Sequence, residues 1–221
     1  MSAYEIEIKS LLGGEERALK LKGDLVGQGA KLVAKNNQLN HYFVLEDKKD
    51  LENLSKYIPE DKKELFNKII KEGNDLSVRT RDTDGKVIFV IKASIGDDTS
   101  SNGVSRMEFE CVMPMSLDEL DRLLVDAGLK YQAKWSRERE EYKLGDTNVC
   151  IDRNAGYGYL AEFEKVVGDD VDTEEIKKDL YELMDQFGVE ELMQDRLERM
   201  FDYYNQNWMD YYGTDKVFNI E

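Results

Sequence analysis

Apolar and polar residues alternate over many short stretches of this chain, and this pattern predicts β-strands. In the first stretch, "YEIEIKSLL", the charged residues Glu5, Glu7 and Lys9 share one face and Ile6 and Ile8 share the other, because successive side chains of a strand point to opposite faces. A hairpin signal, Asp-Gly between two alternating runs, adds two strands. The predicted strands cover 4–12, 30–47, 75–94 (the hairpin), 104–113, 130–144, 147–154 and 158–167.

Between and after these strands the apolar spacing changes to the helical period. Helices are predicted at 15–28 and 116–127, and the second begins with a capping box, Ser116 with Glu119. One or two short helices surround Pro59, and a strong helix at 172–187 continues as helix over 189–213. The sequence therefore predicts one α+β domain over 1–221, with about eight mostly antiparallel strands in 1–168 and a helical tail in 169–221.

Several strands carry charged residues of one sign at positions i and i+2. This gives each strand a charged stripe on one face and an apolar stripe on the other. An open antiparallel sheet with one solvated face would account for this pattern. So would a closed eight-stranded barrel with a charged lumen, whose outward apolar residues would be covered by the helices at 15–28, 116–127 and 172–187. Those outward residues would be Ile6, Ile8, Met107, Phe109 and Phe163.

The composition narrows the possible partners. The chain has 221 residues, 41% hydrophobic and 35% charged, with a formal net charge of −16. This charge argues against binding a nucleic-acid backbone or an anionic membrane surface, although a local cationic cluster can still hold a small anion. There is neither an apolar run long enough to span a bilayer nor a signal-like N-terminus, so a cytoplasmic location is expected. Cys111 and Cys150 are expected to be buried thiols, and one histidine, His41, excludes a histidine-rich metal site.

The charged stripes suggest a particular chemistry. Clustered carboxylates repel one another unless they are protonated or bind a metal, and oxygen ligands of this kind suit Mg²⁺ or Mn²⁺. Arginine pairs suit bidentate contact with phosphate oxygens. A polyphosphate would satisfy both groups, because metals bridge its oxygens and cations bind the remainder.

The same residues resemble a known family. "EIEIK" is similar to the ExExK signature of the CYTH superfamily, also called triphosphate tunnel metalloenzymes, which includes inorganic triphosphatases, thiamine-triphosphatases and class IV adenylyl cyclases. The resemblance continues in order through "VRTR", "VIK", "RMEFE", "RER", "IDR" and "GYGYLAEFE", and covers about residues 4–165. One ExExK motif is weak, but the whole series in family order is highly specific.

The resemblance implies an eight-stranded antiparallel tunnel jacketed by helices, a triphosphate substrate and two Mg²⁺ or Mn²⁺ ions per site. It implies catalytic roles for Glu5, Glu7 and Lys9. Metal binding would be divided among Glu5, Glu7, Glu108, Glu110, Glu162 and Glu164, with Asp152 near the metal or the cations. The phosphate-binding residues would be Lys9, Arg79, Arg81, Lys92, Arg106, Arg137 and Arg139.

Two stretches depart from the family pattern. Asn40 in "NHYF" stands where an acidic residue is common, and the neighbouring His41 is expected to face outward or satisfy a local hydrogen bond. The aromatic tail, residues 203–212, does not match the short endings of the family. Its aromatic residues are open to three roles: core packing, a lid over one tunnel mouth, or a homodimer contact.

The family does not fix the reaction. Hydrolysis of inorganic tripolyphosphate is the first hypothesis, because both Glu162 and Glu164 are present. A class IV adenylyl cyclase is the second, with the ribose 3′-hydroxyl as nucleophile. A thiamine-triphosphatase and a non-catalytic polyphosphate- or nucleotide-binding module are further alternatives. The acidic residues argue against the last, since anion binding alone needs few carboxylates.

Overall fold

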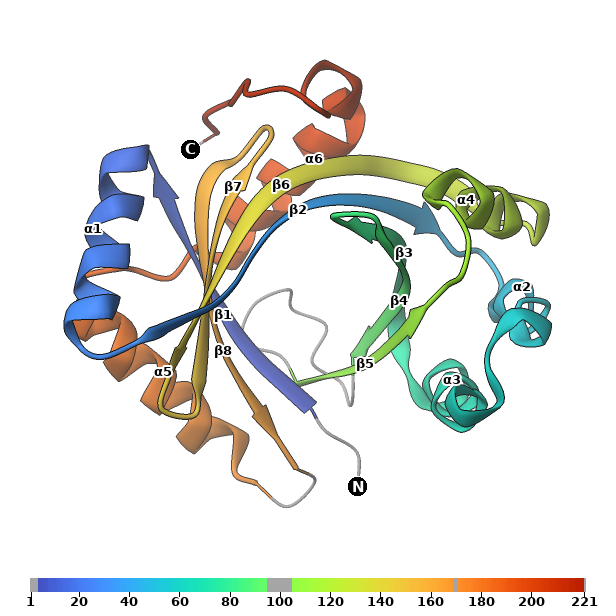
Figure 1. Ribbon diagram of the computed structural model, residues 1–221, viewed down its shortest axis with the longest axis horizontal. Helices are drawn as coiled ribbons and strands as arrows, with labels where there is room; N and C mark the ends of the chain where they lie inside the picture. Colours follow the sequence, from blue (N-terminus) through green and yellow to red (C-terminus); the bar gives the residue numbers. More distant parts are fainter. Residues whose placement is uncertain (1–3, 95–104, 169–170, 221) are drawn as a thin grey trace.

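Eight antiparallel strands form one closed barrel in the computed structural model, which describes residues 4–94, 105–168 and 171–220 (Figure 1). The strand order around the barrel is β1-β5-β4-β3-β2-β6-β7-β8. The barrel predicted as one of two alternatives is thus confirmed. The strands are β1 (Tyr4–Gly13), β2 (Lys31–Val44), β3 (Asn74–Thr83), β4 (Lys86–Ser94), β5 (Ser105–Val112), β6 (Lys130–Leu144), β7 (Thr147–Asn154) and β8 (Gly158–Val167).

The helices lie between and after these strands and match their predicted ranges closely, except at the C-terminal end. They are α1 (Glu15–Gly27), α2 (Lys48–Glu52), the short 3₁₀ helix η1 (Ser55–Tyr57), α3 (Glu60–Glu72), α4 (Leu117–Asp126), α5 (Thr173–Phe187), α6 (Gln194–Asn207) and the 3₁₀ helix η2 (Trp208–Asp210). The capping box of Ser116 and Glu119 is present at the start of α4.

The strand register turns the charged stripes inward. Glu7 lies opposite Glu164 and Lys9 opposite Glu162 across the β1–β8 pair, whereas Ile8 lies opposite Phe163 on the outer face. All three apolar side chains of the outer set on β1 and β8 (Ile6, Ile8 and Phe163) are fully buried. The seam between β1 and β5 is short: among the described residues it comprises Tyr4, Glu5 and Ile6, facing Met107, Arg106 and Ser105.

Three groups of helices cover the outside of the barrel (Figure 1). Helices α1 and α5 bury the outer face of β1, β7 and β8. Helices α2, α3 and α4 bury the outer face of β3, β4 and β5, and α6 packs on β6 and the β7–β8 turn. The predicted cover by α1, α4 and α5 is confirmed. The α3 helix is an addition: its Phe66 packs against Phe89 and Phe109.

The prediction of continuous helix after α5 is wrong for residues 189–193. Gly188 adopts a left-handed conformation (φ 63°) that ends α5, as glycine commonly does at a helix C-terminus. The following link runs back to the barrel, where the Leu192 amide donates a hydrogen bond to the Lys9 carbonyl. Helix α6 begins only at Gln194.

The aromatic tail packs onto the barrel through ring contacts and a backbone pairing. Tyr204 is fully buried and stacks on Trp135 with a centroid distance of 3.6 Å. Farther along, Val217 forms a parallel bridge with Gly156 in the β7–β8 turn. A Cβ on Gly156 would lie 2.6 Å from the Tyr204 ring, so only glycine permits this approach. Core packing is therefore one role of the tail.

His41 lies on the outer side of β2, as expected. Its Nδ1 is 2.7 Å from an oxygen of the buried Asp121 on α4, and its Nε2 is 2.8 Å from the Tyr212 hydroxyl. The same aspartate accepts hydrogen bonds from Thr80 and Tyr131. Both ring nitrogens of His41 thus have hydrogen-bond partners, which gives this residue a structural role.

Both cysteines are free thiols in buried positions, as predicted. Within the described residues, no helix has the length and apolar character needed to cross a bilayer.

Candidate functional site

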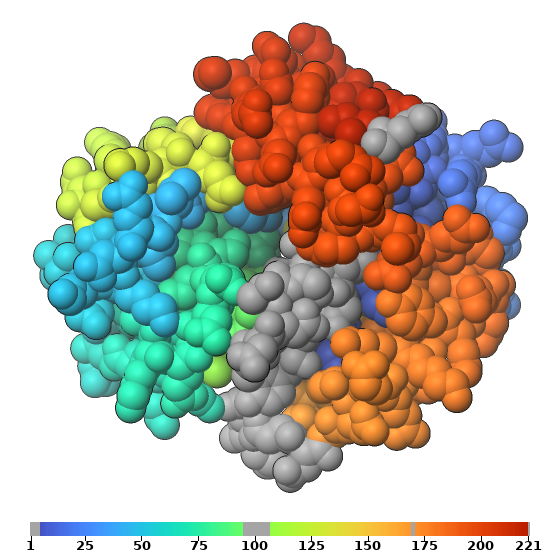
Figure 2. Space-filling view, turned by 180° about the vertical axis from the view of Figure 1, so that it is seen from behind, coloured from blue at the N-terminus to red at the C-terminus, as the bar shows by residue number. Residues whose placement is uncertain are grey.

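The barrel encloses a cavity of about 550 Å³, lined mainly by inward-facing side chains of the strands and at one end by α6. Figure 2 shows the molecular surface hollowed beside α6, the orange-red segment. Ten of the predicted site residues line the cavity: Glu7, Lys9, Arg79, Arg81, Lys92, Arg137, Arg139, Asp152, Glu162 and Glu164. Since the residues come from six strands, closure of the barrel brings them together.

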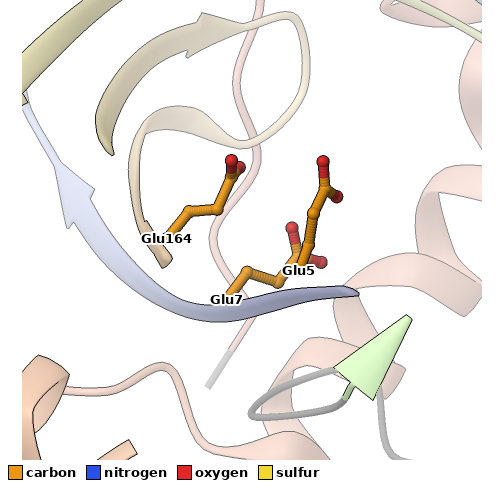
Figure 3. A group of neighbouring side chains, drawn as sticks. All are labelled: Glu5, Glu7 and Glu164. Atoms are coloured by element: carbon orange, nitrogen blue, oxygen red, sulfur yellow. The ribbon is translucent and has the colours of Figure 1, made fainter. Parts of the chain in front are cut away.

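Three carboxylates form one compact group on β1 and β8. Oxygen atoms of Glu5, Glu7 and Glu164 all lie within 4.8 Å of one another, and Figure 3 shows the three side chains gathered in one place. Burial, together with neighbouring carboxylates that include Glu108, raises the pKa of Glu5 to about 8, despite the opposing charge of Lys92. Burial also raises the pKa of Glu164. Burial therefore favours the protonated forms of Glu5 and Glu164 in the absence of a bound cation.

Lysines lie at the edge of this group. The Lys92 ammonium is 2.7 Å from Glu5 and 3.3 Å from Glu108, and Lys9 is 2.6 Å from Glu7. Burial would lower the pKa of Lys92, but the charges of Glu7, Glu108 and Glu5 raise it above its usual range. Lys92 is therefore a fixed cation inside the tunnel.

A buried aspartate holds two arginines of β6. Asp152 is fully buried and accepts hydrogen bonds from Arg139 Nε (2.7 Å), Arg139 Nη2 (2.6 Å) and Arg137 Nη1 (2.8 Å). Arg139 also binds Glu162. Burial alone would raise the pKa of Glu162, but Arg139, Lys9 and Arg137 hold it well below its usual range. The sequence predicted that Asp152 would lie near either the metal or the phosphate-binding cations. These contacts favour the second position.

The arginines of β3 complete the cationic wall. Arg79 donates to the Tyr42 hydroxyl at 2.7 Å, and Arg81 donates to Asn40 at 3.0 Å and Glu110 at 2.9 Å. Burial and the neighbouring guanidiniums of Arg79 and Arg137 lower the pKa of Arg81 to about 10. Like charges are therefore crowded here, and a polyanion would relieve their repulsion.

The remaining predicted residues are not lining residues of this cavity, or their side chains are not among those that the structure describes. Glu5 and Glu108 bind Lys92, and Glu110 binds Arg81 with its side chain 42% exposed. None of these three carboxylates is a lining residue of the cavity. The side chain of Arg106 lies outside the described residues, although its backbone belongs to β5.

The sequence reasoning missed several lining residues. Tyr42 lies on the face of β2 that pairs with the arginine face of β3, and Trp135 shares the face of Arg137 and Arg139. The period-2 rule could have found these residues. No local signal places α6 over the tunnel, so its four lining residues (Leu197, Glu198, Phe201 and Asp202) could not be found in this way.

A family model described as the CYTH domain matches residues 67–196, which is more than half of the chain. The chain belongs to the CYTH family. The resemblance seen in the sequence motifs is thereby confirmed, and no curated protein matches the chain.

Solved structures show the same CYTH fold at low identity. A conserved hypothetical protein from Pyrococcus furiosus is 20% identical, with a TM-score of 0.61 over 84% of this chain and 91% of that one. An adenylate cyclase candidate from Vibrio parahaemolyticus is 14% identical, with a TM-score of 0.60 over 91% and 99%. A protein from Hippeastrum, described as an adenylyl cyclase candidate with a dominant triphosphatase activity, is 16% identical, with a TM-score of 0.53 over 85% and 89%.

Proposed function

We propose that this CYTH protein is a metal-dependent triphosphatase that hydrolyses a phosphoanhydride bond of a triphosphate held in the tunnel, with inorganic tripolyphosphate as a substrate. One observation carries this proposal: Glu7 and Glu164 of the compact carboxylate group line the same cavity as the crowded cationic wall. The described activity of the Hippeastrum protein of the same fold is consistent with it. The cytoplasmic location expected from the sequence is part of the same proposal.

The carboxylate group fits a divalent cation. Glu5, Glu7 and Glu164 offer closely spaced oxygen donors, which are the ligands that Mg²⁺ and Mn²⁺ prefer. The pKa of Glu5 is raised mainly by burial and further by the neighbouring carboxylates, so a bound cation would favour its ionised form over the protonated one. When bound, the metal would offset phosphate charge and lower the pKa of a water nucleophile. The proposed second ion would require Glu162 or Glu108 to exchange its present cationic partner.

The cationic wall would bind and orient the phosphate chain. Guanidinium pairs bind phosphate oxygens in bidentate fashion, and fixed donors that face developing charge stabilise a phosphoryl-transfer transition state. Asp152 holds Arg137 and Arg139 in place through three hydrogen bonds, so little reorganisation would be needed when substrate binds. Lys9 and Lys92 would contact the part of the chain nearest the carboxylates.

A class IV adenylyl cyclase is the second candidate, because the cavity extends past the cations to aromatic residues that could hold a base. Purified protein with Mg²⁺ or Mn²⁺ tests both. Tripolyphosphate, ATP and thiamine triphosphate are assayed side by side for phosphate, pyrophosphate and cyclic AMP. Phosphate release from tripolyphosphate supports the proposal. Cyclic AMP and pyrophosphate from ATP, without phosphate release from any substrate, would replace it with the cyclase.

A further inference from the structure

One face of β2 carries a row of uncharged polar side chains beside the cationic wall. Gln38, Asn40 and Tyr42 stand at alternate positions of this strand, so they share a face, and we name them the β2 acceptor row. Gln38 and Asn40 are only 5% and 2% exposed, and of the three side chains only Tyr42 lines the cavity. Gln38 and Asn40 can therefore act on a ligand in the cavity only through their neighbours.

These neighbours are arginines, because β2 lies between β3 and β6 in the barrel. Asn40 faces Arg81 across the β2–β3 pair, and Gln38 faces Arg137 across the β2–β6 pair. Each member of the row accepts a hydrogen bond from a different arginine of the cavity wall. The bonds are Arg137 Nε to Gln38 Oε1 (2.8 Å), Arg81 Nε to Asn40 Oδ1 (3.0 Å) and Arg79 Nη1 to the Tyr42 hydroxyl (2.7 Å). Uncharged acceptors thus orient three guanidinium groups.

Carboxylates compensate the charge of these arginines unevenly. On β6, Arg137 also pairs with the fully buried Asp152. On β3, Arg79 makes no ion pair with another described residue, and the carboxylate that pairs with Arg81, Glu110, has a side chain that is 42% exposed. Water and salt screen an exposed carboxylate, so it offsets less charge than a buried one. Direct ion pairs therefore compensate the positive charge of the wall least on β3.

An uncharged acceptor and a carboxylate act differently on a guanidinium. Both fix the direction of its N–H groups, but only the carboxylate cancels its charge. Asparagine and aspartate have nearly the same shape, so either residue at position 40 could hold Arg81. With asparagine there, burial and the charges of Arg79 and Arg137 lower the pKa of Arg81 to about 10. The row thus preserves a repulsion between like charges that a bound polyanion would relieve.

From these contacts we propose that Asn40 is a positioning residue for Arg81 that makes the tunnel selective for highly charged anions. Together with Gln38 and Tyr42 it orients the arginines and leaves their charge available. The attraction between the wall and a ligand grows with the product of their charges, so tripolyphosphate gains more from an uncancelled charge than orthophosphate does. The inference rests on the proposed function and refines it, because it names what favours a triphosphate over the phosphate that hydrolysis releases.

The chain offers a matched pair of variants for the test. Asn40→Asp keeps the acceptor oxygen and adds one negative charge beside Arg81. Asn67→Asp makes the same chemical change at an exposed position of α3, so it controls for the net charge of the chain. The wild type and both variants are titrated calorimetrically with tripolyphosphate and with orthophosphate in EDTA, where no metal supports turnover.

Asn40→Asp should raise the Kd for tripolyphosphate about tenfold and the Kd for orthophosphate by no more than about threefold, because the added charge repels each ligand in proportion to the charge of that ligand. Asn67→Asp should leave both values unchanged. The inference is overturned if the ratio of the tripolyphosphate Kd to the orthophosphate Kd fails to rise in Asn40→Asp, since a purely structural role would weaken both ligands alike. An equal rise in Asn67→Asp would overturn it too.

Thermal melts without ligand show whether the variants fold. If Asn40→Asp does not fold, Gln38→Glu takes its place, since it adds a charge beside Arg137 and should raise the same ratio of Kd values.

Binding and turnover together separate this inference from the proposed function. Tripolyphosphate that binds the wild type with the expected dependence on Asn40, but is not hydrolysed with Mg²⁺ or Mn²⁺, would refute the triphosphatase and support the selective wall. Hydrolysis by the wild type, with an unchanged ratio of Kd values in Asn40→Asp, would refute the inference alone. If neither ligand binds the wild type in EDTA, the inference is refuted whatever the activity.

Discussion

At the scale of single residues, the tunnel wall contains two kinds of carboxylate. Glu162, which has several cations around it, stays ionised because Arg139, Lys9 and Arg137 lower its pKa. Glu5 and Glu164 are buried among other carboxylates, and their pKa values rise. Sequence spacing cannot separate these two kinds, because both occur as pairs at i and i+2.

Glu7 tests the proposed metal site directly. Glu7→Gln keeps the size of the side chain but removes a charged oxygen donor, so we expect phosphate release to fall by about 100-fold or more. Thermal unfolding should show a folded protein. Glu182→Gln, on the surface of α5, is the control and should retain full activity. Full activity in Glu7→Gln would show that this carboxylate is not a metal ligand.

Asp152 tests the arginine scaffold. Asp152→Asn removes the charge that holds Arg137 and Arg139, leaving buried guanidiniums poorly paired, so the free energy of unfolding should fall by about 3 kcal/mol. The KM for tripolyphosphate should rise more than kcat falls, because the arginines lose their orientation. Urea unfolding and steady-state kinetics measure the two effects. A large fall in kcat with unchanged KM would instead point to a metal-binding role for Asp152.

At the scale of elements, the strands and the face on which each side chain lies followed from alternation, whereas the alternation left an open sheet and a closed barrel as alternatives. The α6 helix behaves differently. Its residues have ordinary helical spacing, and nothing in that spacing distinguishes Phe201, which lines the cavity, from Tyr204, which is core. The break at Gly188 was missed because helix-forming residues stand on both sides of it.

The docking of the tail depends on one glycine. Gly156 has a positive φ of 86°, and a Cβ there would meet the Tyr204 ring at 2.6 Å. Gly156→Ala should therefore lower the free energy of unfolding by about 2–4 kcal/mol, the sum of backbone strain and a displaced aromatic ring. Gly145→Ala is the matched control, since its φ is also positive (59°) but its Cβ would meet no atom within 4 Å. Its cost should be about 1 kcal/mol. Equal losses in urea unfolding would argue against the steric explanation.

At the scale of the whole molecule, a chain with a net charge of −16 builds a cationic wall in its interior. Bulk charge and cavity charge are separable because the barrel shields the inner residues from solvent. The net charge did not exclude a small anionic ligand. It could not show where the cationic side chains would meet, because these side chains come from several strands.

Proton and metal binding should compete in this interior. The fold raises the pKa of Glu5 from 4.5 to about 8, so the folded chain favours the protonated form. The contribution of Glu5 to stability is therefore complete at low pH and is lost as the pH rises through about 8. Added Mg²⁺ should raise the Tm more at about pH 8.5 than at about pH 6, because the ion replaces the lost proton.

Thermal melts of the wild type and of Glu5→Gln, with Mg²⁺ and with EDTA, measure this competition. In EDTA the variant should show a weaker fall in Tm with rising pH, and it should gain less from Mg²⁺. A magnesium effect of the same size at both pH values would contradict the competition.

Among the described residues, the contact between β1 and β5 comprises three residue pairs, and this has a mechanical consequence. A ring of strands opens first where its pairing is shortest, and this ladder, the shortest among the described residues, contains Glu5, one of the three clustered acids. Glu164 lies on β8, which pairs with the other edge of β1. An ion bound by both Glu5 and Glu164 would therefore restrain β1 relative to β8 and stabilise its pairing with β5. Amide hydrogen exchange at Ile6 and Met107 should then slow when Mg²⁺ is added, while exchange in the long β2–β6 ladder stays the same.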